Sequence, residues 1–488
     1  MKLSSKTRLS FLVLILLVGA VGVYATTISP SGVYDTPWGN FTVGVTTPSI
    51  TLNGTTRTSW WGALNPFDQY LNSTDNVSFG SVNVTGDYYL NSVNITDVLY
   101  TSQGATATVG FNEGLDYLPN YWYCDGVADN VQIQAAIDYV YLGARDGGKV
   151  YIQEGLYSIS STITIYGNLI IDGAGQQSTK LILADNADCN MFEYVGADNY
   201  LWFHMYHMLL DGNKDNNVAG NGVYINAAGQ FQDAMFWNVF IARFSEDGLY
   251  TNQGWGLRLI DFLAEFNEGH GVYIGGGSRP QIISCKIRDN DKNGINCRAG
   301  GAIITGNDIG TSGWGGLLLG GGADEGVITG NTFVENTGHH ISVSTGCDDY
   351  VITSNIFDGA GVTNRGVKVD AVGNRNLISN NQFMDHVIVS VLDDGADTKI
   401  NNNVGFITEN IGSATILNGT TNITIAHGLD YTPSSANTAW TVSYLELPTN
   451  DPGSWYIDGF NATSAIIHVL RDPGVSNLDI SWSARRTP

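Results

Sequence analysis

The chain has 488 residues, of which 60 are glycine and only 14% are charged, and its formal net charge is −24. So few charged side chains exclude an architecture of long charged helices, and so many glycines favour short strands joined by tight turns. The negative charge argues against nucleic acid and anionic lipid surfaces as partners, because their phosphates would repel the chain.

Residues 1–25 have the pattern of a signal peptide. Lys2, Lys6 and Arg8 precede an apolar stretch from Phe11 to Val23, and Val23-Tyr24-Ala25 fits a small-x-small cleavage site. We therefore expect export, to the cell surface or outside the cell. If the segment stays uncleaved, it would tether the chain to a membrane. No later segment is apolar enough to be a transmembrane helix.

Residues 26–110 show no coil-like repeat, and we predict a β-rich, glycosylated stalk there. The stretch from Asn65 to Phe79, followed by Val82 to Gly86, resembles stalk segments of tail-fibre and archaeal surface proteins. That resemblance implies a homotrimer, because such stalks commonly trimerise. Asn-x-Ser/Thr sequons, which are acceptors for N-glycosylation in exported chains, lie only outside the central region, at Asn40, Asn53, Asn72, Asn76, Asn83, Asn94, Asn418, Asn422 and Asn461.

The central region, residues 121–405, carries a repeat with a mean step of 24 residues. Its aligned strands begin at Gly222, Gly248, Gly271, Gly294, Gly316, His340 and Gly366. Alternation of apolar residues with a period of two indicates strand, and two or three short strands with their turns fill one coil of a β-solenoid. The sequence therefore predicts an all-β fold in which stacked coils bury like side chains on like.

A second strand recurs in antiphase and carries an asparagine column. Each copy places Asn at the same position, at Asn307, Asn331, Asn355 and Asn381. Buried amides are costly unless they are hydrogen-bonded, so we expect this column to bond along the stack at a bend of the coil.

The beginning of the central region resembles the pectate-lyase-like superfamily. The matching residues are Cys124-Asp-Gly-Val-Ala-Asp129, Ile133-Gln-Ala-Ala-Ile137-Asp138, Gly147-Gly-Lys-Val-Tyr-Ile152 and Gly155-Leu-Tyr157. The resemblance implies a right-handed parallel β-helix over residues 121–405, with a short capping helix from Ile133 to Leu142. The superfamily includes tailspikes, polygalacturonases and archaeal surface proteins, and it mixes lyases, hydrolases and binders, so it leaves the activity open.

Outward positions of the aligned strand bring three tyrosines into one column, Tyr224, Tyr250 and Tyr273. Aromatic rings along a shallow groove stack on sugar rings and offer hydroxyls for hydrogen bonding, so these residues are candidates for carbohydrate binding. The alternative is an outer ladder that only stiffens the sheet.

The turns before these strands bring carboxylates, and paired carboxylates at about 5 to 10 Å are what glycoside hydrolysis needs. The candidate catalytic residues are Glu246, Asp247, Glu268, Asp289 and Asp291. Any acidic β-helix supplies such pairs by accident, since neighbouring coils lie about 4.8 Å apart.

One histidine is similar to a polygalacturonase motif. Gly269-His270-Gly271 matches the Gly-His-Gly of that family, which implies a sugar contact for His270, but the paired aspartates and the Arg-Ile-Lys of the family are missing. A role in the turn is therefore the alternative. A lyase would need an arginine or lysine base and commonly Ca²⁺; otherwise we expect no cofactor, and no compact aspartate cluster predicts a metal site.

Residues 413–488 alternate between short strands and turns, which predicts a β-sandwich-like module. The five cysteines, Cys124, Cys189, Cys285, Cys297 and Cys347, have no metal-site spacing and an odd count, and we expect them to be small apolar residues of the core.

Two functional hypotheses follow from these patterns. The first is an extracellular surface or fibre protein whose β-helix engages polysaccharide, with cleavage undecided, or that only spaces other modules. The second is a glycoside hydrolase or polysaccharide lyase of tailspike or pectinase type.

Overall fold

The computed structural model describes residues 50–52, 55–57, 89–90, 93–94, 106–113, 120–141, 147–196, 202–229, 231–446 and 450–487. The chain divides into two units, Met1–Gly104 and Ala105–Pro488. In the first unit the described residues form two antiparallel pairs, β1 (Ile50–Leu52) with β2 (Thr55–Arg57) and β3 (Tyr89–Leu90) with β4 (Val93–Asn94).

The expected signal peptide and most of the expected stalk lie outside the described residues. Asn40, Asn53, Asn72, Asn76 and Asn83 fall there, and of Asn94 only the backbone is described. Among the described residues, no helix combines the length and the apolar character that crossing a bilayer requires.

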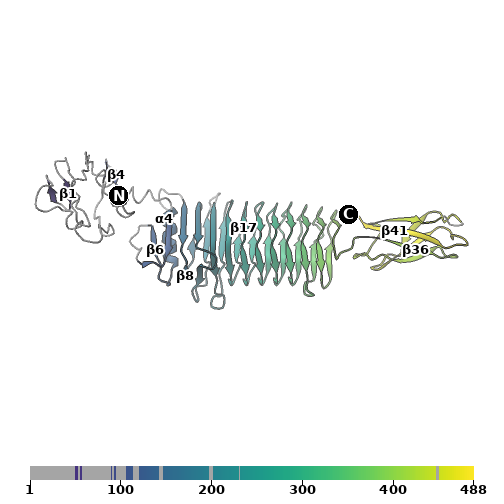
Figure 1. Cartoon of the computed structure of the whole chain (residues 1–488), viewed down its shortest axis with the longest axis horizontal. Coiled ribbons are helices and arrows are strands. Elements are labelled where there is room, and N and C mark those ends of the chain that lie inside the picture. The colour runs from purple at the N-terminus through teal and green to yellow at the C-terminus, as the bar shows by residue number, and fades with distance from the viewer. Residues whose placement is uncertain are drawn as a thin grey trace, which may run out of the picture. The chain divides into compact units, whose positions relative to one another are not determined.

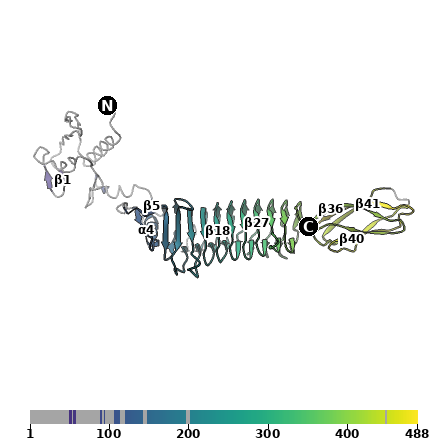
Figure 2. The same cartoon turned by 60° about the horizontal axis from the view of Figure 1, so that its bottom comes forward.

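The second unit begins with a parallel β-solenoid, in which strands of successive coils lie side by side (Figures 1 and 2). One face is a ten-stranded sheet with one strand from each coil. Its strands are β9 (Ile163–Thr164), β12 (Phe192–Gly196), β14 (Val223–Ala227), β16 (Leu249–Thr251), β19 (Val272–Ile274), β22 (Asn293–Cys297), β25 (Gly315–Leu319), β28 (His339–Val343), β31 (Arg365–Val369) and β34 (Val389–Asp393).

The other faces form one bent sheet of 21 strands. Its first eight strands are β5 (Thr106–Gly110), β6 (Tyr121–Tyr123), β7 (Gly148–Ile152), β8 (Gly155–Ile159), β10 (Leu169–Gly173), β11 (Thr179–Leu183), β13 (Phe203–Asp211) and β15 (Met235–Ala242). One later row comprises β17 (Arg258–Ile260), β20 (Gln281–Ile283), β23 (Ile303–Thr305), β26 (Val327–Thr329), β29 (Val351–Thr353), β32 (Leu377–Ser379) and β35 (Lys399–Asn401). The other comprises β18 (Leu263–Glu265), β21 (Lys286–Arg288), β24 (Asp308–Gly310), β27 (Thr332–Val334), β30 (Ile356–Asp358) and β33 (Gln382–Met384).

The register of the ten-stranded sheet confirms the repeat alignment. Val223 pairs with Leu249, Leu249 with Val272, and Val272 with Ile295, and all four side chains are buried. The antiphase strands likewise stack like on like, because Phe333 and Phe357 lie 5.1 Å apart between ring centroids and Phe357 and Phe383 lie 4.9 Å apart. The interior is therefore made of columns that run along the solenoid.

The asparagine column is a buried hydrogen-bonded ladder, as predicted. The Oδ1 of Asn355 accepts both the backbone N–H and the side-chain amide of Asn331, each at 3.0 Å. The amide of Asn355 donates in turn to the Ile328 carbonyl and to Asn381. Each inner member thus hydrogen-bonds both the preceding and the following coil at the bend.

Helix α4 (Asn130–Tyr141) covers the N-terminal end of the solenoid, as the family resemblance implied. Its apolar side, with Ile133, Ile137 and Val140, is buried in the core. The helix begins three residues earlier than expected, after Asp129, whose carboxylate is buried and accepts the backbone N–H groups of Gly126 and Ser158.

Two three-stranded antiparallel sheets follow the solenoid, consistent with the sandwich-like module expected there. They share a small apolar core that includes Ile416, Val442, Ile425 and Ile467. One sheet contains β36 (Glu409–Ile416), β41 (Leu478–Arg486) and β38 (Thr438–Tyr444); the other contains β37 (Asn422–Ala426), β40 (Ser464–Val469) and β39 (Trp455–Asp458).

All five cysteines are free thiols, and four of them are buried while Cys189 is half-buried. Burial raises the pKa of Cys285 to about 12 and that of Cys297 to about 11. Because the thiolate is the reactive form, these side chains act as small apolar residues, as expected.

We predict that Asn355→Ala lowers the free energy of unfolding by about 3 kcal/mol, because it leaves the buried N–H groups of Asn331 and the Ile328 carbonyl without partners. Urea denaturation followed by circular dichroism measures the change. Thr353→Ala, at a half-buried outward position two residues away, is the matched control and should change stability by less than about 0.5 kcal/mol. Equal effects of the two variants would contradict a structural role for the ladder.

We also predict that the solenoid loses stability as the pH falls below about 6.5. Burial, and secondarily the nearby His386, lower the pKa of His340 to about 3. Between pH 7 and pH 5 the His340 side chain therefore becomes protonated in the unfolded chain but stays neutral in the folded one. This difference should lower the free energy of unfolding by about 2 kcal/mol. Denaturation at both pH values measures this loss. A His340→Leu variant with the same pH dependence would contradict the assignment.

Candidate functional site

Three aromatic rings are stacked on the outer side of the ten-stranded sheet, and we name Tyr224, Tyr250 and Tyr273 the tyrosine strip. Their strands β14, β16 and β19 pair in register, so each ring lies directly on the next coil's ring. The centroids are 4.8 Å and 4.9 Å apart, with interplanar angles of 14° and 1°. The rings are half-buried rather than fully exposed, because each covers part of its neighbour.

Cationic side chains lie at the end of the strip nearest the later coils. The Arg298 guanidinium lies 5.7 Å from the centroid of Tyr273. One coil further, the indole of Trp314 is 60% exposed and has the Lys292 ammonium 5.8 Å from its centroid. The strip therefore joins stacked rings to charged hydrogen-bond donors on one surface.

Asp247 and His270 belong to a ladder of acceptors in the turn beside the strip. Asn221 accepts the backbone N–H of Asp247 at 2.9 Å, Asp247 accepts that of His270 at 2.6 Å, and the Nδ1 of His270 accepts that of Asn293 at 3.1 Å. Each side chain therefore binds the backbone of the following coil, which is a structural role.

The position of His270 fits the turn role that was the alternative to sugar binding. Its side chain is buried, with its ring 5.7 Å from Tyr273 and 6.0 Å from Trp314. Burial, followed by nearby Lys292, lowers the pKa of His270 to about 4. The neutral ring supports the aromatic surface from below.

The five candidate acids lie in different environments. Glu246, Glu268 and Asp291 are exposed on successive turns, and Glu246 accepts a hydrogen bond of 2.6 Å from Asn221. Asp289 instead occupies a left-handed corner after β21, with φ of 55°. Burial raises the pKa of Asp247, the direction that a general acid needs, but one of its oxygens already holds the His270 backbone.

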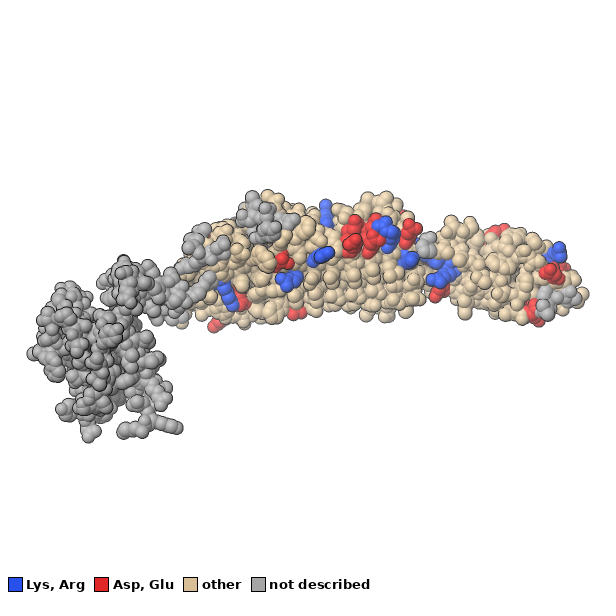
Figure 3. All heavy atoms as spheres, turned by 90° about the horizontal axis from the view of Figure 1, so that it is seen from above, with Lys and Arg blue, Asp and Glu red and all other residues tan. Residues whose placement is uncertain are grey.

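The described residues contain no group of three or more His, Cys, Asp or Glu side chains arranged to hold a metal ion. Charged side chains instead pair along the surface, as when Arg375 binds Asp349 at 2.6 Å and Asp348 at 3.4 Å. Figure 3 shows a short strip of acidic and basic side chains lying next to one another on a face that is otherwise mostly uncharged.

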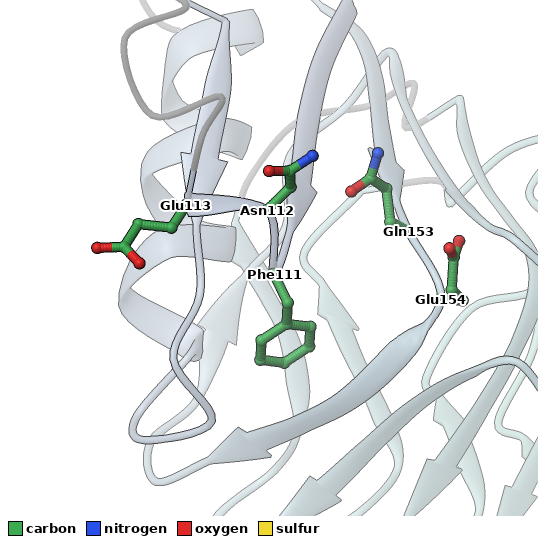
Figure 4. Close-up of a pocket in the computed structure, with 5 residues that line it drawn as sticks. All are labelled: Phe111, Asn112, Glu113, Gln153 and Glu154. Atoms are coloured by element: carbon green, nitrogen blue, oxygen red, sulfur yellow. The ribbon is translucent and has the colours of Figure 1, made fainter.

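A shallow pocket lies at the N-terminal edge of the solenoid, away from the tyrosine strip. It is lined by Phe111, Asn112, Glu113, Gln153 and Glu154. Figure 4 shows the Glu113 carboxylate pointing away from that of Glu154, so the two acids do not face each other across the pocket.

A second aromatic group, which the repeat alignment did not find, lies on the 21-stranded sheet. Trp237 and Tyr206 point outward from β15 and β13, beside His207 and Asp172. The first coils are longer and less regular than the later ones, so no alignment placed these residues together. The local density of aromatic and histidine residues from Trp202 to His207 was the available signal.

Comparison with known proteins bears on the fold. Residues 247–404 match the family of the right handed beta helix region. A search of curated proteins finds no match.

Solved structures similar to the chain include the mannuronan C-5 epimerase AlgE6 A-module of Azotobacter vinelandii, at 19% identity over 57% of this chain and 96% of that one, with a TM-score of 0.38. The ORF18 protein of Geobacillus virus E2 has 16% identity over 88% and 83%, with a TM-score of 0.48. The Streptococcus pneumoniae surface protein and adhesin PfbA has 13% identity over 58% and 94%, with a TM-score of 0.41.

The resemblance found in the sequence is thus confirmed at the level of the fold. The register of the strands and the family match agree over the regular coils. The middle of this chain is a right-handed parallel β-helix of about ten coils.

Proposed function

We propose that the β-helix binds polysaccharide along the tyrosine strip. The observation that carries this proposal is the stack itself, in which three parallel, stacked rings extend over about 10 Å and remain half-exposed on the outside of the sheet. Aromatic side chains present an apolar body and a hydroxyl together, a combination that suits a sugar ring with its apolar face and its hydroxyl groups.

Arg298 and Lys292 favour a glycan that carries carboxylate groups. Both cations lie over aromatic rings at one end of the strip, and their N–H groups can donate hydrogen bonds to hydroxyl or carboxylate oxygens. The overall charge of −24 would otherwise repel an acidic polymer, so local cations are needed where one binds.

Binding without cleavage is the function that the geometry favours. Asp247, which is half-buried, is engaged in the turn ladder, and the exposed acids stand on successive turns. A hydrolase instead holds two carboxyl groups across the scissile bond, one of them kept protonated.

The proposal places the protein outside the cell or on its surface, as the N-terminal pattern of residues 1–25 suggests. Among the described sequons, Asn418, Asn422 and Asn461 are exposed on the C-terminal sheets, where glycans could be accommodated. Trimerisation through the N-terminal stalk and membrane tethering by an uncleaved signal remain parts of the proposal.

We expect Tyr250→Ala to weaken glycan affinity by about 1 to 2 kcal/mol, because Tyr250 is the central ring and contacts both neighbours. Affinity electrophoresis of the intact chain in gels containing alginate, homogalacturonan or dextran measures the change. Tyr456→Ala removes an exposed tyrosine from β39 and is the matched control. Unchanged retardation of the Tyr250 variant on every gel that retards the wild type would return the strip to a structural role.

We expect no cleavage of these polysaccharides by the intact chain. Prolonged incubation should produce neither new reducing ends nor the unsaturated products of a lyase. If products appear, Asp247→Asn and Glu268→Gln distinguish the candidate acids, and their loss of activity would overturn the non-catalytic proposal.

A further inference from the structure

We infer that the solenoid carries a second carbohydrate site, centred on Trp237 and separate from the tyrosine strip. We name Trp237, Tyr206, His207, Asp172 and Lys149 the tryptophan corner. It lies on the 21-stranded sheet, whereas the tyrosine strip lies on the ten-stranded sheet, so the two surfaces belong to different faces of the coils.

The indole of Trp237 is an exposed ring that is held in place. It is 42% exposed, and its Nε1–H donates to Asp261 of the next coil at 3.2 Å. The rings of His207 and Tyr206 lie 5.0 Å and 6.1 Å from it, both in edge-to-face geometry. A large apolar surface fixed in this way loses little freedom when a flat sugar face stacks on it.

Polar groups lie in the same column beside the ring. Tyr151, Asp172, Tyr206 and Trp237 occupy paired positions on four successive strands. Asp172 accepts from the Lys149 ammonium at 2.6 Å and from the Nδ1 of His207 at 2.8 Å. Lys149 and His207 remain 39% and 31% exposed, so both can also reach a ligand hydroxyl.

The same column changes character beyond the corner. After Trp237 it continues as Ile260 and Ile283, and then as Thr305, Thr329 and Thr353. Threonine and isoleucine are ordinary outward residues of a strand. In this column, aromatic and charged residues therefore occur only in the first coils. The later coils form the same sheet without them, so pairing of the strands does not require them.

The backbone at His207 supports the same inference. His207 occupies a left-handed corner with φ of 55°, and the residues at this corner in the next coils are Asn238, Asp261 and Ser284. Short polar side chains tolerate this conformation by bonding locally, whereas the His207 ring turns to Asp172 and Trp237. The ligand class that fits an apolar ring bordered by hydroxyl-binding groups is a polysaccharide.

The test measures the two sites separately on one intact chain. Wild type, Trp237→Ala, Tyr250→Ala and the double variant are compared by affinity electrophoresis with alginate, homogalacturonan and dextran. We expect Trp237→Ala to weaken binding at least fivefold, Trp237→Phe to retain part of it, and the double variant to lose all retardation. Thermal unfolding checks that each variant folds, which is expected because both substituted side chains lie on the outer surface of the coils.

The outcomes separate this inference from the proposed function. Binding that is abolished by Tyr250→Ala and unchanged by Trp237→Ala would overturn the second site and leave the tyrosine strip standing. Binding lost only in the Trp237 variant would support the second site and overturn the strip. A wild type that is retarded by none of the three polymers would overturn both sites for these classes of glycan.

Discussion

The hydrogen bonds between successive coils constrain everything else in the solenoid. Parallel pairing holds equivalent residues about one strand separation apart, near 4.8 Å, on every face. Inside, this spacing places Phe357 and Phe383 with centroids 4.9 Å apart. Outside, it places Tyr250 and Tyr273 at the same 4.9 Å. One backbone rule thus makes a core column when the side chain points inward and an aromatic surface when it points outward.

This constraint explains which features could be predicted from the sequence. Over the regular coils, the repeat gives the register directly, so the buried column through Leu249 and Val272, the Asn355 ladder and the outward direction of Tyr250 all follow from alternation. The turns are different, because a turn residue's direction depends on its own dihedral angles. Asp247 therefore binds the His270 N–H along the turn and Asp289 occupies a left-handed corner, although the repeat placed both beside the tyrosines.

The register of the first coils could not be predicted from the repeat. β13 and β15 are long strands of nine and eight residues that continue around the bend, and the later coils divide the same path into two strands of three. A fixed step therefore cannot align Tyr206 with Trp237, and only the three-dimensional register brings them together. The tryptophan corner was missed because it lies where the period changes.

A contribution to stability would explain the tyrosine strip more readily than the tryptophan corner. Stacked rings stabilise a sheet by about 0.5 to 1.5 kcal/mol per pair, so the tyrosine strip could be retained for stability alone. Trp237 is harder to explain in that way, because it meets the rings of Tyr206 and His207 edge-to-face and leaves much of its surface in water. If both surfaces bind, a rigid solenoid holds them at a fixed separation, and one polymer long enough to reach around a coil would gain avidity without any new contact. That gain requires a flexible glycan, since the surfaces face different directions.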